Sequence, residues 1–400
     1  MQYSSFRKTP PILIAGGGIG GLAAAIALAR KGWPVTLLEK HKKAPEEGAG
    51  IQLGPNGTRI LHELGIATHL KHLIAEPRGI RVMDGVSGSL LTHLPLGQSI
   101  AEKYGSPYWV LHRADLHAAM TAVILEMQSI NFQTDSEVVN AISNSDGVGV
   151  YLKDGRHLSG CALIAADGIW SNVRTQILKR SPLLFSGKCA LRAVIPSNDL
   201  PDELFRTDTT LWLRPSSHIV HYPVRGGREI AITAIFDDDM QSQNWSEPVD
   251  LTSLSSRTAL FPSKLKALLA KPYLWRKWSL YTHNETNPLV SQRISLLGDA
   301  GHPILPFLAQ GAVMALEDAA VLATVLDKTS NRDIPQSLAL YATLRYKRVQ
   351  SIQKASAQNG RIYHYAGMYR IFRNLALKIL PPSFILSRYN WIYKWTINEV

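Results

Sequence analysis

The first forty residues of the chain alternate between apolar runs and a glycine cluster. Residues 12–15 form a short apolar run, residues 16–21 are almost all glycine, and residues 22–30 are rich in alanine and leucine. A second apolar run over residues 35–38 ends at Glu39. Short, continuous apolar runs are typical of parallel strands that are covered on both faces. The pattern therefore predicts a strand, a tight turn, a helix and a second strand.

Farther along the chain, shorter apolar segments alternate with polar positions. This β-rich pattern covers residues from about 75 to 100 and from about 185 to 236, where Pro and Gly interrupt it. Alternation with a period of two is typical of antiparallel strands with one face on the core. Residues 112–168, between these stretches, return to a helix-and-strand pattern. We therefore expect the second sheet to be an insertion into the first domain.

The C-terminal part of the chain has a helical pattern. Its periodicity predicts helices over residues 311–327 and 336–358 and an amphipathic helix around residues 360–380. We therefore expect an α/β protein with a discontinuous first domain, an inserted antiparallel-sheet domain and a C-terminal helical region. The first domain is expected to comprise residues 1–75, 101–184 and 285–330. The inserted domain is expected to comprise residues 76–100 and 185–284, and the helical region residues 331–400.

The glycine cluster fits the G-x-G-x-x-G pattern of dinucleotide-binding proteins. Gly16 permits the tight turn, Gly18 lets the backbone approach a pyrophosphate, and Gly21 lets the helix lie close to the strand. Glu39 stands 18 residues after Gly21, where a carboxylate can bind ribose hydroxyls. Glycines also form ordinary turns, so it is the strand before the cluster, the helix after it and the acid that favour a dinucleotide.

Two later segments help to decide which dinucleotide is bound. Residues 163–174 contain a buried strand that ends in Asp167-Gly168, and residues 294–303 contain another that ends in Gly298-Asp299. The second segment continues through Pro306 into a predicted helix that begins near Gly311. Either segment alone is a common turn. In this order and at these separations, after the glycine cluster, they favour FAD.

Together these motifs resemble the class A flavoprotein monooxygenases, which are single-component aromatic hydroxylases. Within that family the chain is most similar to the salicylate, 3-hydroxybenzoate and 6-hydroxynicotinate hydroxylase group. The resemblance extends from Ile12 to about Lys354 and includes the segments 48–56 and 112–116. It implies a Rossmann-like FAD-binding domain, an inserted substrate domain and C-terminal helices.

The resemblance also implies where FAD is held. Glu39 is expected to bind the adenosine ribose, Arg113 to lie near the pyrophosphate, and Asp299 to bind the ribityl chain. Backbone N–H groups of Gly311 and Ala312 are expected at the N1–C2=O edge of the flavin, where a helix N-terminus stabilises negative charge. The other cofactor-binding positions that the family implies are Gly16, Gly18, Gly21, Gly50, Ile51, Asp167 and Pro306.

In this family NADH or NADPH reduces FAD, dioxygen forms a C4a-hydroperoxyflavin, and a small phenolic or aromatic acid is hydroxylated. No second glycine motif with a βα pattern is present, so the nicotinamide is expected as a transient co-substrate. Phenolate is a better nucleophile than phenol, and a base near the ring hydroxyl is therefore required.

The candidate base lies on a β-rich segment. His218 and Tyr222 share one face of a predicted strand, and they match pocket residues of the 6-hydroxynicotinate-type relatives. A half-buried structural histidine is the alternative for His218. His221, on the other face, is expected toward solvent. His302 is a further catalytic candidate near the flavin, although a loop-ordering role explains it as well, and Gln52 is a candidate substrate contact.

Composition limits the partners. The net charge is +12, yet no basic run or zinc-finger spacing indicates nucleic acid, and no His/Cys/Asp cluster has metal-ligand spacing. Two cysteines and a polar start without an apolar signal segment predict a cytoplasmic protein. A homodimer is compatible with the sequence. The basic, partly apolar tail could touch a membrane surface, but packing against the body is the preferred interpretation.

Three other functions stay open at this point. The protein could be a membrane-surface hydroxylase of a larger, quinone-precursor-like aromatic, as the tail suggests. It could also be a flavin oxidase or reductase that does not hydroxylate, or a flavin-binding module without turnover. Oxygen stoichiometry separates hydroxylases from the last two.

Overall fold

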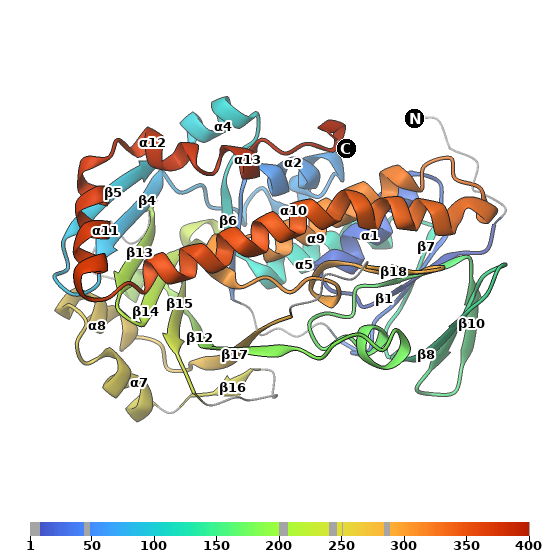
Figure 1. Cartoon of the computed structure of the whole chain (residues 1–400), viewed down its shortest axis with the longest axis horizontal. Coiled ribbons are helices and arrows are strands. Elements are labelled where there is room, and N and C mark those ends of the chain that lie inside the picture. Colours follow the sequence, from blue (N-terminus) through green and yellow to red (C-terminus); the bar gives the residue numbers. More distant parts are fainter. Residues whose placement is uncertain are drawn as a thin grey trace.

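The computed structural model describes residues 9–43, 49–199, 207–239, 246–249, 251–283 and 289–399. Two large sheets lie at opposite ends of the molecule, and one long helix runs across both (Figure 1). Gly48, the first residue of the family-like segment 48–56, lies outside the described residues.

The first sheet has six strands in the order β18-β19-β11-β1-β2-β7. Every pair is parallel except β18 with β19. This confirms the strand–helix–strand prediction for the start of the chain. The strands are β1 (Ile12–Ala15), β2 (Val35–Leu38), β7 (Ile130–Gln133), β11 (Ala162–Ala165), β18 (Val290–Ser291) and β19 (Ile294–Leu296).

Helix α1 (Ile19–Arg30) packs between this sheet and two other helices, α5 (Arg113–Leu125) and α9 (Gly311–Val325). Residues 21–29 of α1 are all buried. A helix that is apolar on every side is stable only inside a core, and the small alanines allow its neighbours to approach closely. Packing against this helix therefore positions α5 and α9 beside it.

The second sheet has eight strands in the order β16-β17-β12-β15-β14-β13-β4-β5. It is mainly antiparallel, as expected, but β4 and β13 run parallel. Its strands come from the expected ranges 76–100 and 185–284, except that β12 begins one residue earlier, and the exact domain limits remain our prediction. They are β4 (Gly79–Asp84), β5 (Leu90–Pro95), β12 (Leu184–Pro196), β13 (Thr209–Arg214), β14 (Ser217–Val224), β15 (Glu229–Asp237), β16 (Glu247–Pro248) and β17 (Arg276–Thr282).

The remaining strands and helices of this part of the chain are smaller. The strands are β3 (Gly50–Leu53) paired with β6 (Trp109–His112), and a three-stranded sheet of β8 (Val138–Ser143), β9 (Val148–Leu152) and β10 (His157–Gly160). The helices are α2 (Pro55–Glu63), α3 (Ala67–Leu70), α4 (Gln98–Tyr104), α7 (Leu251–Thr258) and α8 (Ser263–Leu269).

The C-terminal region is helical, as predicted. Helix α10 (Ile334–Tyr363) spans 30 residues and is longer at both ends than its periodicity indicated. It is followed by α11 (Gly367–Ile379), α12 (Pro382–Ser387) and α13 (Asn390–Tyr393). Among the described residues, no helix combines the length and the apolar character that crossing a bilayer requires.

Buried charges join α9 to α10. Glu317 and Asp318 of α9 are fully buried. Arg345 of α10 donates to Asp318 Oδ1 at 2.6 Å and to Glu317 Oε2 at 3.0 Å, and Arg348 donates to Glu317 Oε1 at 2.8 Å. His302 Nε2 lies 2.5 Å from Asp318 Oδ2. We call these five side chains the buried charge network.

Replacing Arg345 with Ala should destabilise the protein strongly, because it leaves two buried carboxylates with too little positive charge. Removing one partner of a buried ion pair typically costs about 3–5 kcal/mol of unfolding free energy. Urea unfolding followed by circular dichroism measures the change. The exposed Arg361→Ala is the control and should change the unfolding free energy by less than about 0.5 kcal/mol. Equal effects of the two variants would contradict this assignment.

Candidate active site

The glycine turn after β1 is built for close approach. Gly16 has φ +105°, and a Cβ there would lie 2.3 Å from the Ala166 carbonyl oxygen. A Cβ on Gly21 would lie 1.9 Å from the Gly16 oxygen. By contrast, no atom lies within 4 Å of a Cβ built on Gly18, where α1 begins. The tight packing thus surrounds an open space at a helix N-terminus, which suits a pyrophosphate.

Glu39 faces this turn from the end of β2. Its Oε2 accepts a hydrogen bond from the Gly17 N–H at 2.7 Å, and its Oε1 accepts one from the His41 N–H at 2.8 Å. The His117 ring nitrogen Nε2 lies 2.7 Å from the Gly17 oxygen. The carboxylate is therefore held beside the open space, where a ribose would lie if the pyrophosphate occupied it.

Arg113 and Asp299 line the continuation of this space. Arg113 begins α5, and Asp299 follows β19 in the 3-10 turn Gly298–Ala300. Both residues are exposed to solvent, and their charges are close enough to interact. Loss of solvation lowers the pKa of the Arg113 guanidinium and raises the pKa of the Asp299 carboxyl; their mutual attraction opposes both shifts.

Asp167 lies at the same edge of the first sheet, after β11. Its Oδ2 accepts a hydrogen bond from the Val173 N–H at 3.2 Å, and burial raises the pKa of its carboxyl. Residues at the carboxyl ends of parallel strands form the ligand site of open α/β sheets. The structure therefore brings Gly18, Glu39, Asp167 and Asp299 to one edge.

The flavin end of the predicted site begins at α9. Gly311 is the first residue of this 15-residue helix, and no atom lies within 4 Å of a Cβ built on it. Ala312 follows it in the first turn, and Pro306 begins the preceding 3-10 turn. The N-terminus of α9 is thus open, so its free N–H groups can stabilise an anionic ring edge.

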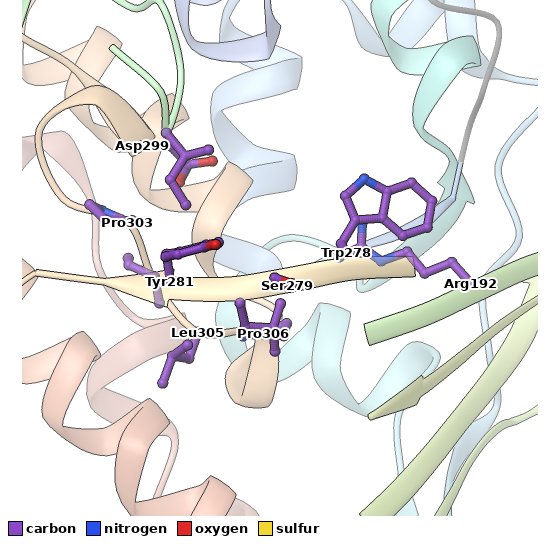
Figure 2. A pocket seen from close by; sticks show the side chains of 11 residues that line it. Arg192, Trp278, Ser279, Tyr281, Asp299, Pro303, Leu305 and Pro306 are labelled. Atoms are coloured by element: carbon purple, nitrogen blue, oxygen red, sulfur yellow. The ribbon is translucent and has the colours of Figure 1, made fainter. Parts of the chain in front are cut away.

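A pocket lies between the second sheet and the loop that connects β19 to α9 (Figure 2). Asp299 and residues 303–306 line one side, and residues of β12 and β17 line the other. The Arg192 guanidinium lies 5.0 Å from the centre of the Trp278 ring. Arg192 is a pocket residue that no sequence motif predicted. Its signal was available, since an arginine interrupts the otherwise apolar run 189–195.

Strand register places the pocket residues in rows across the second sheet. Val220 of β14 pairs with Thr233 of β15, which pairs with Arg192 of β12. All three are partly exposed, although the residues next to them in β14 and β15 are buried. Inner strands of a covered sheet are normally buried, so these three residues mark an open recess. We call them the recess row.

His218 and Tyr222 lie on the same face, one on each side of the recess row. His218 is buried, and its Nδ1 lies 2.9 Å from Nε2 of His364, which follows α10. His364 Nδ1 lies 3.2 Å from Asp237 Oδ1, and Lys188 forms an ion pair with Asp237. His364 was missed from sequence because it is 146 residues away from His218.

His218 and His364 are both held neutral near pH 7. Burial lowers the pKa of His218 well below its usual value, and the neighbouring His364 and Lys188 lower it further. Burial and Lys188 lower the pKa of His364 to about 4, although Asp237 opposes that shift. A neutral imidazole has a free lone pair and can accept a proton.

Tyr222 packs against Gly50, in the family-like segment 48–56. A Cβ on Gly50 would lie 2.4 Å from Tyr222 Cε2, so only glycine fits there. Burial raises the pKa of the Tyr222 phenol, and Arg192 and a hydrogen bond with Gln52 oppose this shift. Gln52 Oε1 also accepts a hydrogen bond from the Tyr108 hydroxyl at 2.9 Å. Gln52 and its neighbour Ile51 are both partly exposed, in the strand that carries Gly50.

Two histidines have surroundings that sequence reasoning did not anticipate. His221 was expected toward solvent, and this is wrong: it is fully buried, and its Nε2 accepts a hydrogen bond from Trp212 Nε1 at 3.1 Å. Burial lowers its pKa to about 3. His302 is buried in the charge network against Asp318. Across the described ranges, no group of three or more His, Cys, Asp or Glu could hold a metal.

Comparison with known proteins agrees with this geometry. A profile of the family described as FAD binding domain matches residues 9–356. The chain is 36% identical over 390 residues to the 3-hydroxybenzoate 6-hydroxylase of Klebsiella oxytoca, covering 97% of each chain. It is 32% identical over 357 residues to the 6-hydroxynicotinate 3-monooxygenase of Bordetella bronchiseptica, covering 88% of this chain and 91% of that one.

Solved structures show the same fold. A salicylate hydroxylase substrate complex matches with a TM-score of 0.83 at 25% identity, over 98% of this chain and 97% of the other. HpxO of Klebsiella pneumoniae, complexed with FAD and uric acid, matches with a TM-score of 0.83 at 27% identity, over 94% and 95%. The chain therefore belongs to the family of FAD-dependent aromatic monooxygenases, which use NADH or NADPH as co-substrate.

Proposed function

We propose that this enzyme hydroxylates a small phenolic acid of the hydroxybenzoate type, bound over the recess row. The observation that carries this proposal is the partial exposure of Val220, Thr233 and Arg192 in the middle of buried strands. The row has a cation at one end, which suits a carboxylate, and a neutral histidine nearby, which suits a phenol. The names of the relatives support the same substrate class, since hydroxybenzoate and hydroxynicotinate are both anionic hydroxylated rings.

The residues at the edge of the first sheet fit FAD. Gly18 and Gly311 leave open space at two helix N-termini, and Arg113 and Asp299 face the groove between them. In our proposal Glu39 holds the adenosine ribose, Arg113 neutralises the pyrophosphate, and the N–H groups of Gly311 and Ala312 contact the flavin edge. FAD bound there would supply the redox chemistry: it would accept a hydride from the nicotinamide and deliver one oxygen atom of O2 to the aromatic ring, with the other atom leaving as water.

His218 acts in this proposal as the base for the substrate hydroxyl. With Nδ1–H donating to His364 Nε2, the free Nε2 of His218 can accept the phenol proton. The Nδ1 proton then passes to His364, whose own Nδ1 faces Asp237 near the surface. Both imidazoles are neutral at neutral pH, so each can accept the proton in turn. Their lowered pKa values make them weak bases, and the transfer is therefore completed only when the proton leaves past Asp237 to solvent. We call this chain the His218–His364–Asp237 relay.

Tyr222 and Gln52 position the ring, and His302 orders the loop that carries Asp299. Tyr222 packs on Gly50, and a hydrogen bond joins it to Gln52. His302 acts on the site through Asp318 instead of touching substrate. A cytoplasmic location, a homodimer and the domain limits stay predictions, and sedimentation velocity tests the oligomeric state.

Asp299→Ala and Gly18→Val should each weaken FAD binding by at least about tenfold, which is about 1.4 kcal/mol. The first removes the carboxylate from the groove, and the second fills the space left open for the pyrophosphate. Fluorescence titration of the apoprotein with FAD measures the dissociation constant. The control is Glu126→Ala, an exposed carboxylate at the end of α5. Unchanged FAD affinity in both site variants would sink the proposed cofactor groove.

His218→Ala should leave FAD binding intact and slow hydroxylation by roughly 10²–10⁴-fold, the usual loss for a general base. His364→Ala should slow it less and increase the dependence of the rate on added buffer base, since the proton then leaves without the relay. Stopped-flow kinetics over a range of pH values measures both effects.

The exposed His157→Ala is the control for these variants and should match wild type. Tyr222→Phe keeps the ring, so it should mainly raise KM or peroxide release. The ratio of product formed to NAD(P)H consumed distinguishes the cases. If His218→Ala retained wild-type rates and coupling, the base would have to lie elsewhere.

Arg192→Gln should raise KM for a hydroxybenzoate at least about tenfold while changing KM for the matching uncharged phenol little, because it removes a charge-assisted hydrogen bond to a carboxylate. Steady-state assays with the acid and phenol pair measure this selectivity. A loss of FAD affinity with substrate selectivity unchanged would instead assign Arg192 to the cofactor.

A further inference from the structure

Helix α11 turns its polar side toward the protein and its apolar side toward solvent, the reverse of an ordinary surface helix. Its polar side faces the protein: Arg370 donates to Asp84 Oδ2 at 2.7 Å, and the buried Arg373 donates to the Tyr363 carbonyl at 2.8 Å. Its apolar side faces outward, with exposed fractions of 53–69%. That side consists of Met368, Ile371, Phe372, Leu375 and Ile379. Surface helices normally turn their apolar stripe to the core, so this one requires something outside the monomer to cover it.

The charge around α11 indicates what covers it. From residue 334 to residue 398 the chain contains ten Lys and Arg and not one Asp or Glu. Carboxylates from elsewhere in the chain neutralise Arg345, Arg348 and Arg370. Lys378, Arg388 and Lys394 of this region are exposed. A second copy paired face to face would set this cationic region against itself, because a twofold interface uses the same patch on both subunits. An anionic surface is the complementary partner.

The dimensions of α11 suit a lipid surface. With 13 residues it is about 20 Å long at 1.5 Å per residue, too short to span a bilayer but long enough to lie in its plane. It lies at one end of the molecule, along the edge formed by β4 and β5, where neither large sheet covers its outer side (Figure 1). The exposed Phe384 of α12 extends the apolar surface.

We propose that α11 docks on an anionic phospholipid bilayer. Its apolar side chains enter the boundary between headgroups and acyl chains, and Lys378 and Arg388 contact lipid phosphates. The inference does not depend on which aromatic compound is hydroxylated. Through the Arg373 contact, the docked helix is joined to the end of α10 that carries His364.

Vesicle sedimentation tests the proposal. The full-length holoenzyme should pellet with vesicles of equal parts phosphatidylcholine and phosphatidylglycerol, and should stay in solution with phosphatidylcholine alone. Added salt should release it, because screening weakens surface charge attraction. The double variant I371Q/F372Q should bind at least about tenfold more weakly, since it removes two inserted apolar side chains. K378E/R388E should also bind more weakly.

Leu125→Gln is the matched control, because Leu125 is an exposed apolar residue at the end of α5. It should bind vesicles like wild type, and all variants should keep wild-type FAD content and NAD(P)H oxidation. Failure of the wild type to pellet with anionic vesicles would overturn the proposal. So would vesicle binding that I371Q/F372Q leaves unchanged, or a wild-type dimer that this variant dissociates in sedimentation velocity.

Discussion

Two adjacent carboxylates buried in α9 govern how the site is assembled. Glu317 and Asp318 have no exposure, and an unpaired charge in such a place costs several kcal/mol. Their partners come from distant parts of the chain: Arg345 and Arg348 from α10, His302 from the loop after β19, and Asn56 from α2. Asp318 also accepts a hydrogen bond from the Gly298 N–H. The groups that pair with the two carboxylates of α9 therefore hold the turn that carries Asp299 against this helix.

The second sheet serves two purposes because its faces are covered differently. One face packs on α7 and α8 through apolar side chains that include Trp212, Leu254 and Leu265. The other face carries the recess row. The dry face gives the strands a rigid register. The extended backbone of β14 fixes the distance between His218 and Tyr222, which stand four residues apart on that strand.

Local signals made the nucleotide-binding half predictable from sequence. The glycine turn and Glu39 are close in the chain and obey fixed spacings, and the α1 helix follows from its alanine- and leucine-rich run between two glycine turns. The relay could not be predicted, because His364 reaches His218 only through the packing of α10 on the second sheet. His221 was misplaced for a related reason. Alternation separates two faces of a strand, but it does not reveal that α7 and α8 cover the second one.

The parallel pairing of β4 with β13 interlocks the two halves during synthesis. Strands β4 and β5 leave the ribosome about a hundred residues before β12, yet apart from each other they have no partner in their sheet until β13 arrives. The first sheet waits in turn, because β19 joins β11 only after the whole second sheet has been made. Neither half can therefore mature as an independent N-terminal domain, and most stabilising pairings are long in sequence. Nascent chains of this architecture expose open strand edges for most of translation, which makes them natural clients for chaperones.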